Sequence, residues 1–297
     1  MVAVPLRDFF WLISLALIWG SSFAAIKIAV ETMPSMTMVA VRTLVALIVL
    51  IPIMIAQGGR LPLDLLSWKM ALLLGIFGLA LPFFLIGWGE QWVESSQAAI
   101  LMAVMPIVTV TLAHFFTQGD SFHWRKLIGI MLGFLGVLVL VGPEALKGFG
   151  EQVWGQLAIA SGAICYAINV IVTRNLPAYG LLIGRAVMVM ICGVLISVPL
   201  AILIDGFDGL MQASAESLWI TLYLGVLPTG LATLIYFHLV EKCGASFFSY
   251  VNYLNPVFGV IWGALLLAEE INIQALIALI IILSGIAISS RPLSSRS

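Results

Sequence analysis

Residues 34–42 read PSMTMVAVR and residues 177–185 read PAYGLLIGR, so a proline precedes an arginine by eight positions in each half of the chain. Both stretches interrupt long apolar runs. Four further landmarks repeat at a spacing of 150 positions, namely Gly75 with Gly225 and Pro106 with Pro256. Residues 11–148 and 154–290 therefore look like two copies of one hydrophobic unit.

The composition excludes a soluble domain, because 62% of the residues are hydrophobic and 9% are charged. A chain of 297 residues accommodates about ten membrane spans of roughly 20 residues. The lipid bilayer is thus an expected partner. The net charge of -1 and the lack of a basic run give no reason to expect nucleic acid. Three scattered cysteines lack metal-ligand spacing, so neither a metal nor any other cofactor is expected.

Hydropathy and breaks at glycine, proline and charged residues predict an all-α integral membrane protein with ten transmembrane helices. Their expected ranges are 10–30, 37–56, 69–89, 97–117, 125–142, 154–173, 180–204, 218–238, 246–268 and 273–290. With a cytoplasmic amino terminus, nine basic residues fall on the inner side and Lys147 alone falls on the outer side. This bias predicts that both termini are cytoplasmic in a cell membrane.

Five helices in each half have a geometric consequence, because the sixth helix must then enter from the side opposite the first. The predicted organisation is a first repeat at residues 1–148 and a second, inverted repeat at residues 149–297. Inverted repeats are typical of carriers that bind a solute near the bilayer midplane, between the two halves.

Motifs along the chain resemble the drug/metabolite transporter superfamily, and in particular its two-repeat EamA branch. Residues 19–23 read WGSSF before Lys27, and residues 95–100 read SSQAAI. Residues 253–258 read YLNPVF, and residues 267–270 end the segment with LAEE. The resemblance covers nearly the whole chain. It implies ten helices and export of small metabolites, amino acids among them, without naming the substrate.

The two repeats depart from each other and from the family pattern. The sixth helix lacks a tryptophan–glycine pair and offers Cys165, Tyr166 and Asn169 instead, while Asp120 stands where the family has glutamate. The lining of the expected site is therefore asymmetric, which favours binding of a particular substrate.

Polar and aromatic side chains at the middle depth of the spans form the expected substrate site. An amide in hydrocarbon is costly unless it is paired, so these groups should face the interior of the bundle. Hydrogen bonding between helices is the alternative explanation. The expected substrate-binding residues are Trp19, Ser21, Ser22, Tyr166, Asn169, Tyr250, Asn252, Tyr253 and Asn255.

Prolines within four spans free backbone carbonyls that then need another donor, so they predict bent helices that act as hinges or cavity walls. A simple packing kink is the alternative. These residues are Pro82, Pro106, Pro228 and Pro256.

Charged residues inside or next to the spans are candidate gating residues, namely Lys27, Arg42, Glu90 and Arg185. Repeat symmetry places the two arginines near opposite surfaces, where each is expected to hold a gate closed. The expected partners are Glu31, Glu90 or Glu94 for Arg42, and Glu241 or Asp120 for Arg185. Snorkelling toward water is the alternative for the three cations.

No acidic residue is expected in the middle of a span, which favours a facilitator or exchanger, with Glu90 as the candidate for proton linkage. The predicted activity is export or exchange of small amphipathic metabolites by alternating access around a midplane cavity. A lipophilic-cation efflux carrier is an alternative, because aromatic faces bind cations. An intramembrane enzyme is disfavoured, since the sequence has no HExxH, GxSxG or P-loop motif. The sequence leaves the oligomeric state open, a monomer included.

Overall fold

The computed structural model of the chain describes residues 6–116, 124–141, 150–174, 182–243, 248 and 251–289, and those residues are helical apart from short connections. The helical elements are α1 (Leu6–Ala29), α2 (Ser35–Ala56), α3 (Leu65–Gly75), the π-helical η1 (Ile76–Ala80), α4 (Leu81–Gly89), α5 (Ser95–Met102), α6 (Met105–Phe116), α7 (Trp124–Val141), α8 (Glu151–Arg174), α9 (Leu182–Ile204), the short 3-10 helix η3 (Phe207–Leu210), α10 (Ala215–Leu224), the π-helical η4 (Gly225–Leu231), α11 (Ala232–Cys243), α13 (Val251–Leu267) and α14 (Ile273–Ser289).

The described helices form ten stretches that follow the ten predicted spans, so the all-helical membrane fold is confirmed. Six stretches are long and apolar enough to cross a membrane, and shorter apolar helices make up the remaining four. The six are Leu6–Ala29, Ser35–Ala56, Leu65–Gly89, Glu151–Thr173, Leu182–Ile204 and Ala215–Tyr236.

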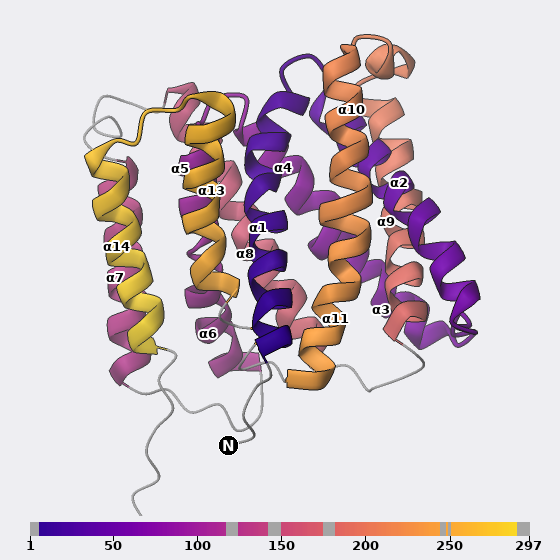
Figure 1. Cartoon of the computed structure of the whole chain (residues 1–297), viewed down its shortest axis with the longest axis horizontal. Helices are drawn as coiled ribbons and strands as arrows, with labels where there is room; N and C mark the ends of the chain where they lie inside the picture. The colour runs from indigo at the N-terminus through magenta and orange to yellow at the C-terminus, as the bar shows by residue number, and fades with distance from the viewer. Residues whose placement is uncertain are drawn as a thin grey trace, which may run out of the picture.

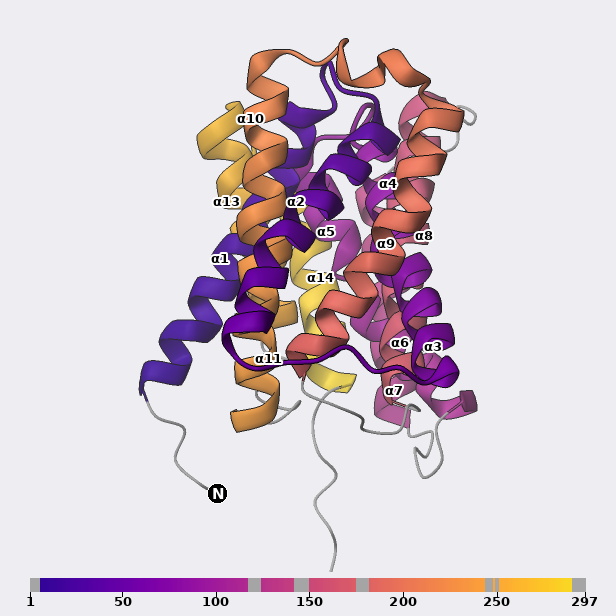
Figure 2. The same cartoon turned by 90° about the vertical axis from the view of Figure 1, so that its right-hand side faces the viewer.

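The bundle has two faces, which we name by where α1 starts. α1 begins and α14 ends at the lower face of Figure 1, which we call the N-terminal face. The upper face, where α1 ends and α10 begins, is called the far face (Figures 1 and 2).

The most extensively packed helix pairs each join the first half of the chain to the second. α1 packs against α13, α2 against α9, α4 against α8, and α7 against α14. One core of buried side chains, which includes Met38, Leu50 and Val187, lies among α2, α9 and their neighbours. A second core, which includes Ile159 and Ile282, lies among α5, α7, α8 and α14. The centre of the bundle is therefore built from both halves.

α3 and α10 each begin with a side-chain N-cap, and the two capping residues, Asp64 and Ser214, lie 150 positions apart. The Asp64 side chain accepts a hydrogen bond from the backbone N–H of Ser67, and the Ser214 side chain accepts one from Ser217. Hydrogen bonds from the Ser67 hydroxyl and from its N–H hold the pKa of the Asp64 carboxylate below its usual range. Each helix then runs into a π-helical segment: η1 ends two residues before Pro82, and η4 includes Pro228. α3 starts at the N-terminal face and α10 at the far face (Figure 2).

The fourth and ninth stretches differ where the sequence predicts matched breaks. α5 ends at Met102 and α6 starts at Met105, so Pro106 is the second residue of a new helix. Pro256, by contrast, lies inside the continuous helix α13. The first half of the chain breaks its helix just before Pro106, whereas α13 continues through Pro256.

Candidate functional site

The centre of the site is the π-helical turn around Pro228. Proline lacks an N–H, so the carbonyl of Leu224 loses its usual helical donor, and the Thr229 hydroxyl donates to that oxygen instead at 2.8 Å. The Pro228 carbonyl accepts a hydrogen bond from the indole Nε1 of Trp19 at 3.0 Å. A broken turn in the second half is thus stabilised by a side chain from the first half.

Arg42 approaches the same turn from α2. Its Nε donates to Thr229 Oγ1 at 2.6 Å, and its guanidinium carbon lies 3.8 Å from the centre of the Phe83 ring. Only 4% of the residue is exposed. Among the described residues, its Nη1 atom has no hydrogen-bond partner.

These contacts correct two expectations about Arg42. The snorkelling alternative is wrong, because the side chain is buried in the bundle. The expected partners Glu31 and Glu94 are exposed, and within the described part of the chain no carboxylate lies within 4 Å of the guanidinium. Thr229 and the face of Phe83 hold the side chain instead.

Aromatic rings surround Trp19 on its other sides. Its ring centre lies 6.3 Å from that of Tyr236 and 6.1 Å from that of Phe248, and the last two rings are 4.9 Å apart. We call Trp19, Tyr236 and Phe248 the aromatic cluster. Through Trp19 this cluster contacts Pro228, while Arg42 contacts Thr229, so the turn meets both aromatic side chains and a cationic group.

The hydroxyls of the two serines expected in the site form hydrogen bonds within the bundle. Ser21 Oγ donates to the carbonyl of Ile18 at 2.7 Å, which leaves its lone pair for the Tyr223 hydroxyl at 2.6 Å. Ser22 Oγ makes a longer bond of 3.4 Å to the same carbonyl. Both serines are buried, and Ser21 links α1 to α10 through Tyr223 in this conformation.

Tyr166 and Asn169 of α8 lie against the π-helical turn of the first half. The ring centres of Tyr166 and Phe83 are 6.5 Å apart, next to Arg42. A methyl group at Gly78 in η1 would come within 2.7 Å of Asn169 Oδ1, so the amide lies directly on this turn. Pro82 follows in the first turn of α4. Each turn therefore faces a polar side chain from the other half.

The expected residues near the start of α13 are only partly described. Tyr250 and the side chain of Tyr253 lie outside the described residues, and Asn252 is partly buried. Asn255 Oδ1 is buried and has no hydrogen-bond partner in the described part of the chain.

Lys27 and Glu90 meet at the far face. The Lys27 ammonium donates to the backbone carbonyls of Glu90 and of Val93, the latter at 2.9 Å. Glu90 follows the last residue of its span, is fully buried, and has no described hydrogen-bond partner on either carboxylate oxygen. Burial raises its pKa well above the usual range, although Lys27 opposes the shift.

Arg185 lies near the start of α9, at the N-terminal face, and is partly buried. Its expected partner Asp120 and the side chain of Glu241 lie outside the described residues. The pairing predicted for this arginine therefore stays a prediction.

Two carboxylates join the halves at the far face. Glu269 accepts from the backbone N–H groups of Ser95 and Ser96 at 2.7 and 2.9 Å, and so caps α5. We call these three residues the far-face clamp. Asp205 likewise accepts from the backbone N–H and the hydroxyl of Thr37, at 2.6 and 2.9 Å. Backbone donors at helix starts favour a negative charge.

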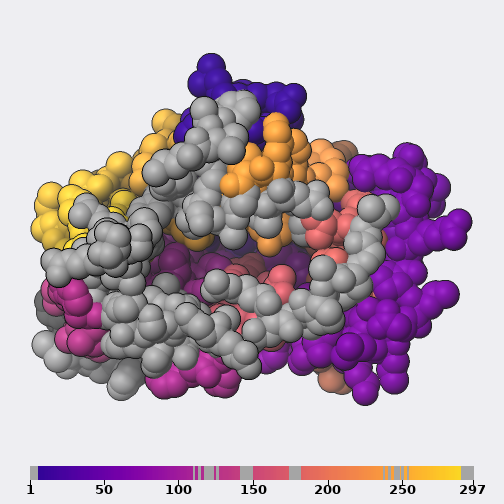
Figure 3. Space-filling model, turned by 90° about the horizontal axis from the view of Figure 1, so that it is seen from below, coloured from indigo at the N-terminus to yellow at the C-terminus, as the bar shows by residue number. Residues whose placement is uncertain are grey.

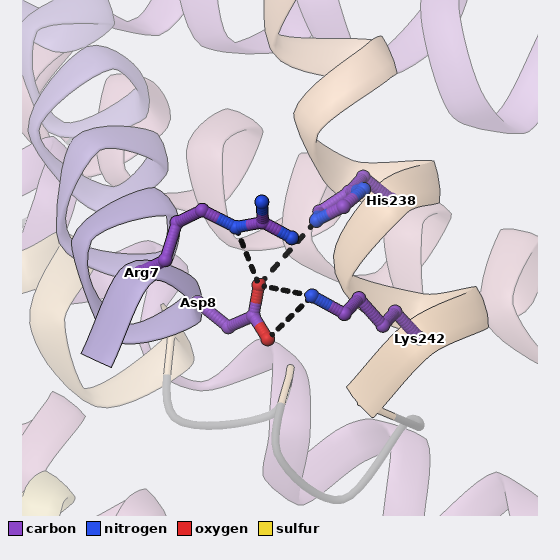
Figure 4. Close-up of polar contacts among 4 residues, drawn as sticks. All are labelled: Arg7, Asp8, His238 and Lys242. Carbon is purple, nitrogen blue, oxygen red and sulfur yellow. Dashed lines mark hydrogen bonds and ion pairs between the residues drawn. The ribbon is translucent and has the colours of Figure 1, made fainter. Parts of the chain in front are cut away.

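An ion-pair cluster joins α1 to α11 at the N-terminal face (Figure 4). The fully buried carboxylate of Asp8 lies 3.0 Å from the Lys242 ammonium and 3.5 Å from His238 Nε2. Arg7 Nε is farther away, at 3.9 Å. We call Asp8, His238 and Lys242 the N-terminal-face cluster. Cys243 is its neighbour, and burial together with the Asp8 charge raises the pKa of its thiol.

The N-terminal face is hollowed near its centre (Figure 3). Segments from both halves of the chain, purple and salmon in the figure, are visible at the floor of this hollow. Among the described residues, no group of three or more histidine, cysteine or acidic side chains is placed to hold a metal.

Several residues of the site have no distinctive sequence signal. Thr229 is one hydroxyl in an apolar run, and its position immediately after Pro228 is the only clue to its bond with the freed carbonyl. Phe83 and Tyr236 look like ordinary apolar helix residues. Glu269 belongs to the LAEE ending that carries part of the family resemblance, but its partners lie 174 and 173 positions away.

Comparisons with known proteins agree with this architecture. The profile of the EamA-like transporter family matches residues 7–142 and 153–291. The chain is 24% identical to the uncharacterized transporter YoaV of Bacillus subtilis (strain 168), over 96% of this chain and 97% of YoaV. It is 29% identical to the uncharacterized inner membrane transporter YedA of Escherichia coli (strain K12), over 88% of this chain and 83% of YedA.

A solved crystal structure of a protein shares the fold, with a TM-score of 0.64 and 19% identity over 95% of this chain and 96% of that one. The family match covers both halves of the chain and nearly all of the described helices. The chain is therefore a membrane transporter rather than an enzyme, and it belongs to the EamA-like transporter family.

Proposed function

We propose that this transporter exports or exchanges small amphipathic metabolites, amino acids among them, by alternating access around the Pro228 turn. The observation that carries the proposal is the buried contact of Arg42 and Trp19 with Thr229 and Pro228. Here two helices of the first half hold a broken helix of the second half, and both polar and aromatic groups are present. Broken helices between two repeats are a common form of solute site in carriers.

We also infer that residues 1–148 and 149–297 are inverted repeats with both termini cytoplasmic. Matched caps at Asp64 and Ser214, followed by matched π-helical turns, support the repeat, and the start of α3 and of α10 at opposite faces supports the inversion. The excess of basic residues at the N-terminal side supports the orientation.

The conformation fits one step of such a cycle. Backbone contacts of Glu269 and Asp205 close the far face, whereas the N-terminal face is hollowed. With the proposed orientation, this is an inward-facing state. Acidic residues of the described spans lie in the end turns, which favours a facilitator or exchanger over an ion-driven pump.

Flux through reconstituted liposomes tests the proposal. Liposomes containing the purified protein are loaded with an unlabelled metabolite, and uptake of the same labelled compound is measured across a panel of amino acids and other small amphipathic solutes. The proposal predicts counterflow of at least one of these solutes. Absence of counterflow for the whole panel, with a folded protein, contradicts it.

Thr229→Val provides a variant matched in shape. Loss of the hydroxyl removes its hydrogen bonds to the Leu224 carbonyl and to Arg42 Nε, so we expect counterflow to fall about tenfold or more, in line with loss of a hydrogen bond to a charged group. Thr229→Ser keeps the hydroxyl and serves as the control. Equal counterflow rates in the valine and serine variants would show that the Thr229 hydroxyl at the Pro228 turn has no part in transport.

A further inference from the structure

We propose that the Arg42 guanidinium binds a carboxylate of the transported solute, so that small carboxylates with an apolar body are the substrate class. The inference rests on the proposed transport function and narrows it. A lipophilic cation would instead meet a like charge at this site.

The first support is the unbalanced charge of Arg42. Its Nε is bonded to Thr229, but Nη1 lacks a described partner and no described carboxylate lies within 4 Å. A buried cation is costly unless it is paired and hydrogen-bonded. The fork of guanidinium N–H groups matches the two oxygens of a carboxylate, so an acidic solute supplies the missing partner.

The second support is the location. Arg42 stands seven residues after the start of α2, which is about 10 Å along the helix at 1.5 Å per residue. Glu90 lies within electrostatic range of Arg42 but forms no ion pair with it. The guanidinium therefore lies inside the bundle, at the contact between both halves, rather than at a surface where water would solvate it.

The third support is the chemistry of the surroundings. The Phe83 ring lies against the guanidinium, Tyr166 lies beside Phe83, and Trp19 is hydrogen-bonded to the Pro228 carbonyl, next to Thr229. These aromatic faces suit an apolar body attached to the carboxylate. Nη1 is enclosed in this conformation, so the solute enters this position when the halves move, as alternating access requires.

Two acids and their amides test the charge requirement on the wild-type protein. The probes are L-phenylalanine with L-phenylalaninamide, and 3-phenylpropanoate with 3-phenylpropanamide. Each pair shares its shape and differs in the carboxylate. We expect each acid to compete for counterflow and to raise the unfolding temperature at concentrations about 10- to 100-fold lower than its amide does. The comparison of the two acids shows whether a zwitterion or a simple anion is preferred.

Variants of Arg42 test which residue provides the preference. Arg42→Gln is expected to abolish the preference for acids over amides, and Arg42→Lys to retain part of it, because lysine keeps the charge without the fork. Arg60→Gln changes the net charge equally at an exposed site and is expected to retain the full preference. If Arg42→Gln does not fold, the acid–amide comparison on the wild type still tests the charge requirement, and a reduced preference in Arg42→Lys assigns it to Arg42.

The outcomes separate this inference from the proposed function. Equal binding of acids and amides by the wild type, stronger binding of L-phenylalaninamide, or an acid preference that survives in Arg42→Gln would each overturn the carboxylate assignment. Counterflow of other solutes without any acid preference leaves transport intact and overturns only the inference. Absence of all counterflow contradicts the proposed function as well.

Discussion

The two faces of the bundle are held together by different kinds of contact. At the far face, the Glu269 carboxylate accepts from backbone N–H groups, and the Lys27 ammonium donates to backbone carbonyls. At the N-terminal face, Asp8 meets the long side chains of Lys242 and His238, which are 38% and 41% exposed. Backbone groups have fixed positions, whereas exposed side chains move at little cost. The far face is thus the more firmly closed of the two, in keeping with the hollow at the N-terminal face.

Removing the charge of the far-face clamp is expected to have the largest effect. Glu269→Gln leaves one backbone N–H of α5 facing an amide NH2 in place of an acceptor, and it removes a charge-assisted bond. We expect the free energy of unfolding to fall by about 1.5–3 kcal/mol. Denaturant unfolding in detergent micelles measures the change.

Glu270→Gln is the matched control, because Glu270 is the exposed neighbour. An equal loss in both variants, or no loss in Glu269→Gln, would show that the clamp does not stabilise the far face.

A substitution that crowds the clamp without touching its charge gives a smaller effect. A methyl group at Gly263 would collide with Glu269 Oε2 and lie 2.9 Å from Ser95 Oγ. Because the crowded atom is the end of a flexible, partly exposed side chain, we expect Gly263→Ala to lower the free energy of unfolding by about 1 kcal/mol.

Gly150→Ala is the control for the alanine itself, since a methyl group there meets nothing within 4 Å. If Gly263→Ala unfolds at the same denaturant midpoint as the wild type, the Glu269 carboxylate can move without loss of stability.

The smallest effect on stability is expected from Asp8→Asn at the N-terminal face. The reactivity of the neighbouring Cys243 thiol as a function of pH is the better measurement for this variant. Cys243 lies beyond the span Ala215–Tyr236, and burial and then the Asp8 charge raise its thiol pKa. Removing that charge lowers the pKa, so more thiolate is present at a given alkaline pH. Maleimide labelling of Cys243, with Cys165 and Cys192 replaced by alanine, should therefore rise at lower pH in Asp8→Asn.

Asp64→Asn keeps a good capping residue at the same face and is expected to leave the labelling profile unchanged. An unaltered profile in Asp8→Asn would mean that Asp8 does not control the surroundings of Cys243.

The helices could be predicted from the sequence because their signals are local. Apolar runs, caps such as Asp64 and Ser214, and breaks at Pro82 and Pro228 lie within a few residues of the structure they determine. Trp19 is likewise expected among the polar and aromatic side chains at the middle depth of the spans, and it contacts the Pro228 turn.

The partners themselves could not be predicted, because they depend on how distant helices pack. Arg42 is near a helix end in the sequence, yet α4, α8 and η4 cover it, so only the packed bundle shows that it is buried. Thr229 gains its role from Leu224 and Arg42 together, and neither contact has a recurring sequence pattern. Asp8 pairs with Lys242, which lies 234 positions away, and the positions of charged residues in the sequence do not identify this pair.

The cap on α5 also has a consequence for biosynthesis. The start of this helix acquires its acceptor only from Glu269, which follows Ser95 by 174 positions. At roughly 5–20 residues per second, a ribosome reaches Glu269 on the order of 10–30 seconds after it has made Ser95. During that interval the two backbone N–H groups need another acceptor at the membrane surface, from water, lipid or an insertion factor. A late part of the chain thus completes a helix start in its first half, and a nascent chain that stops before Glu269 lacks this acceptor.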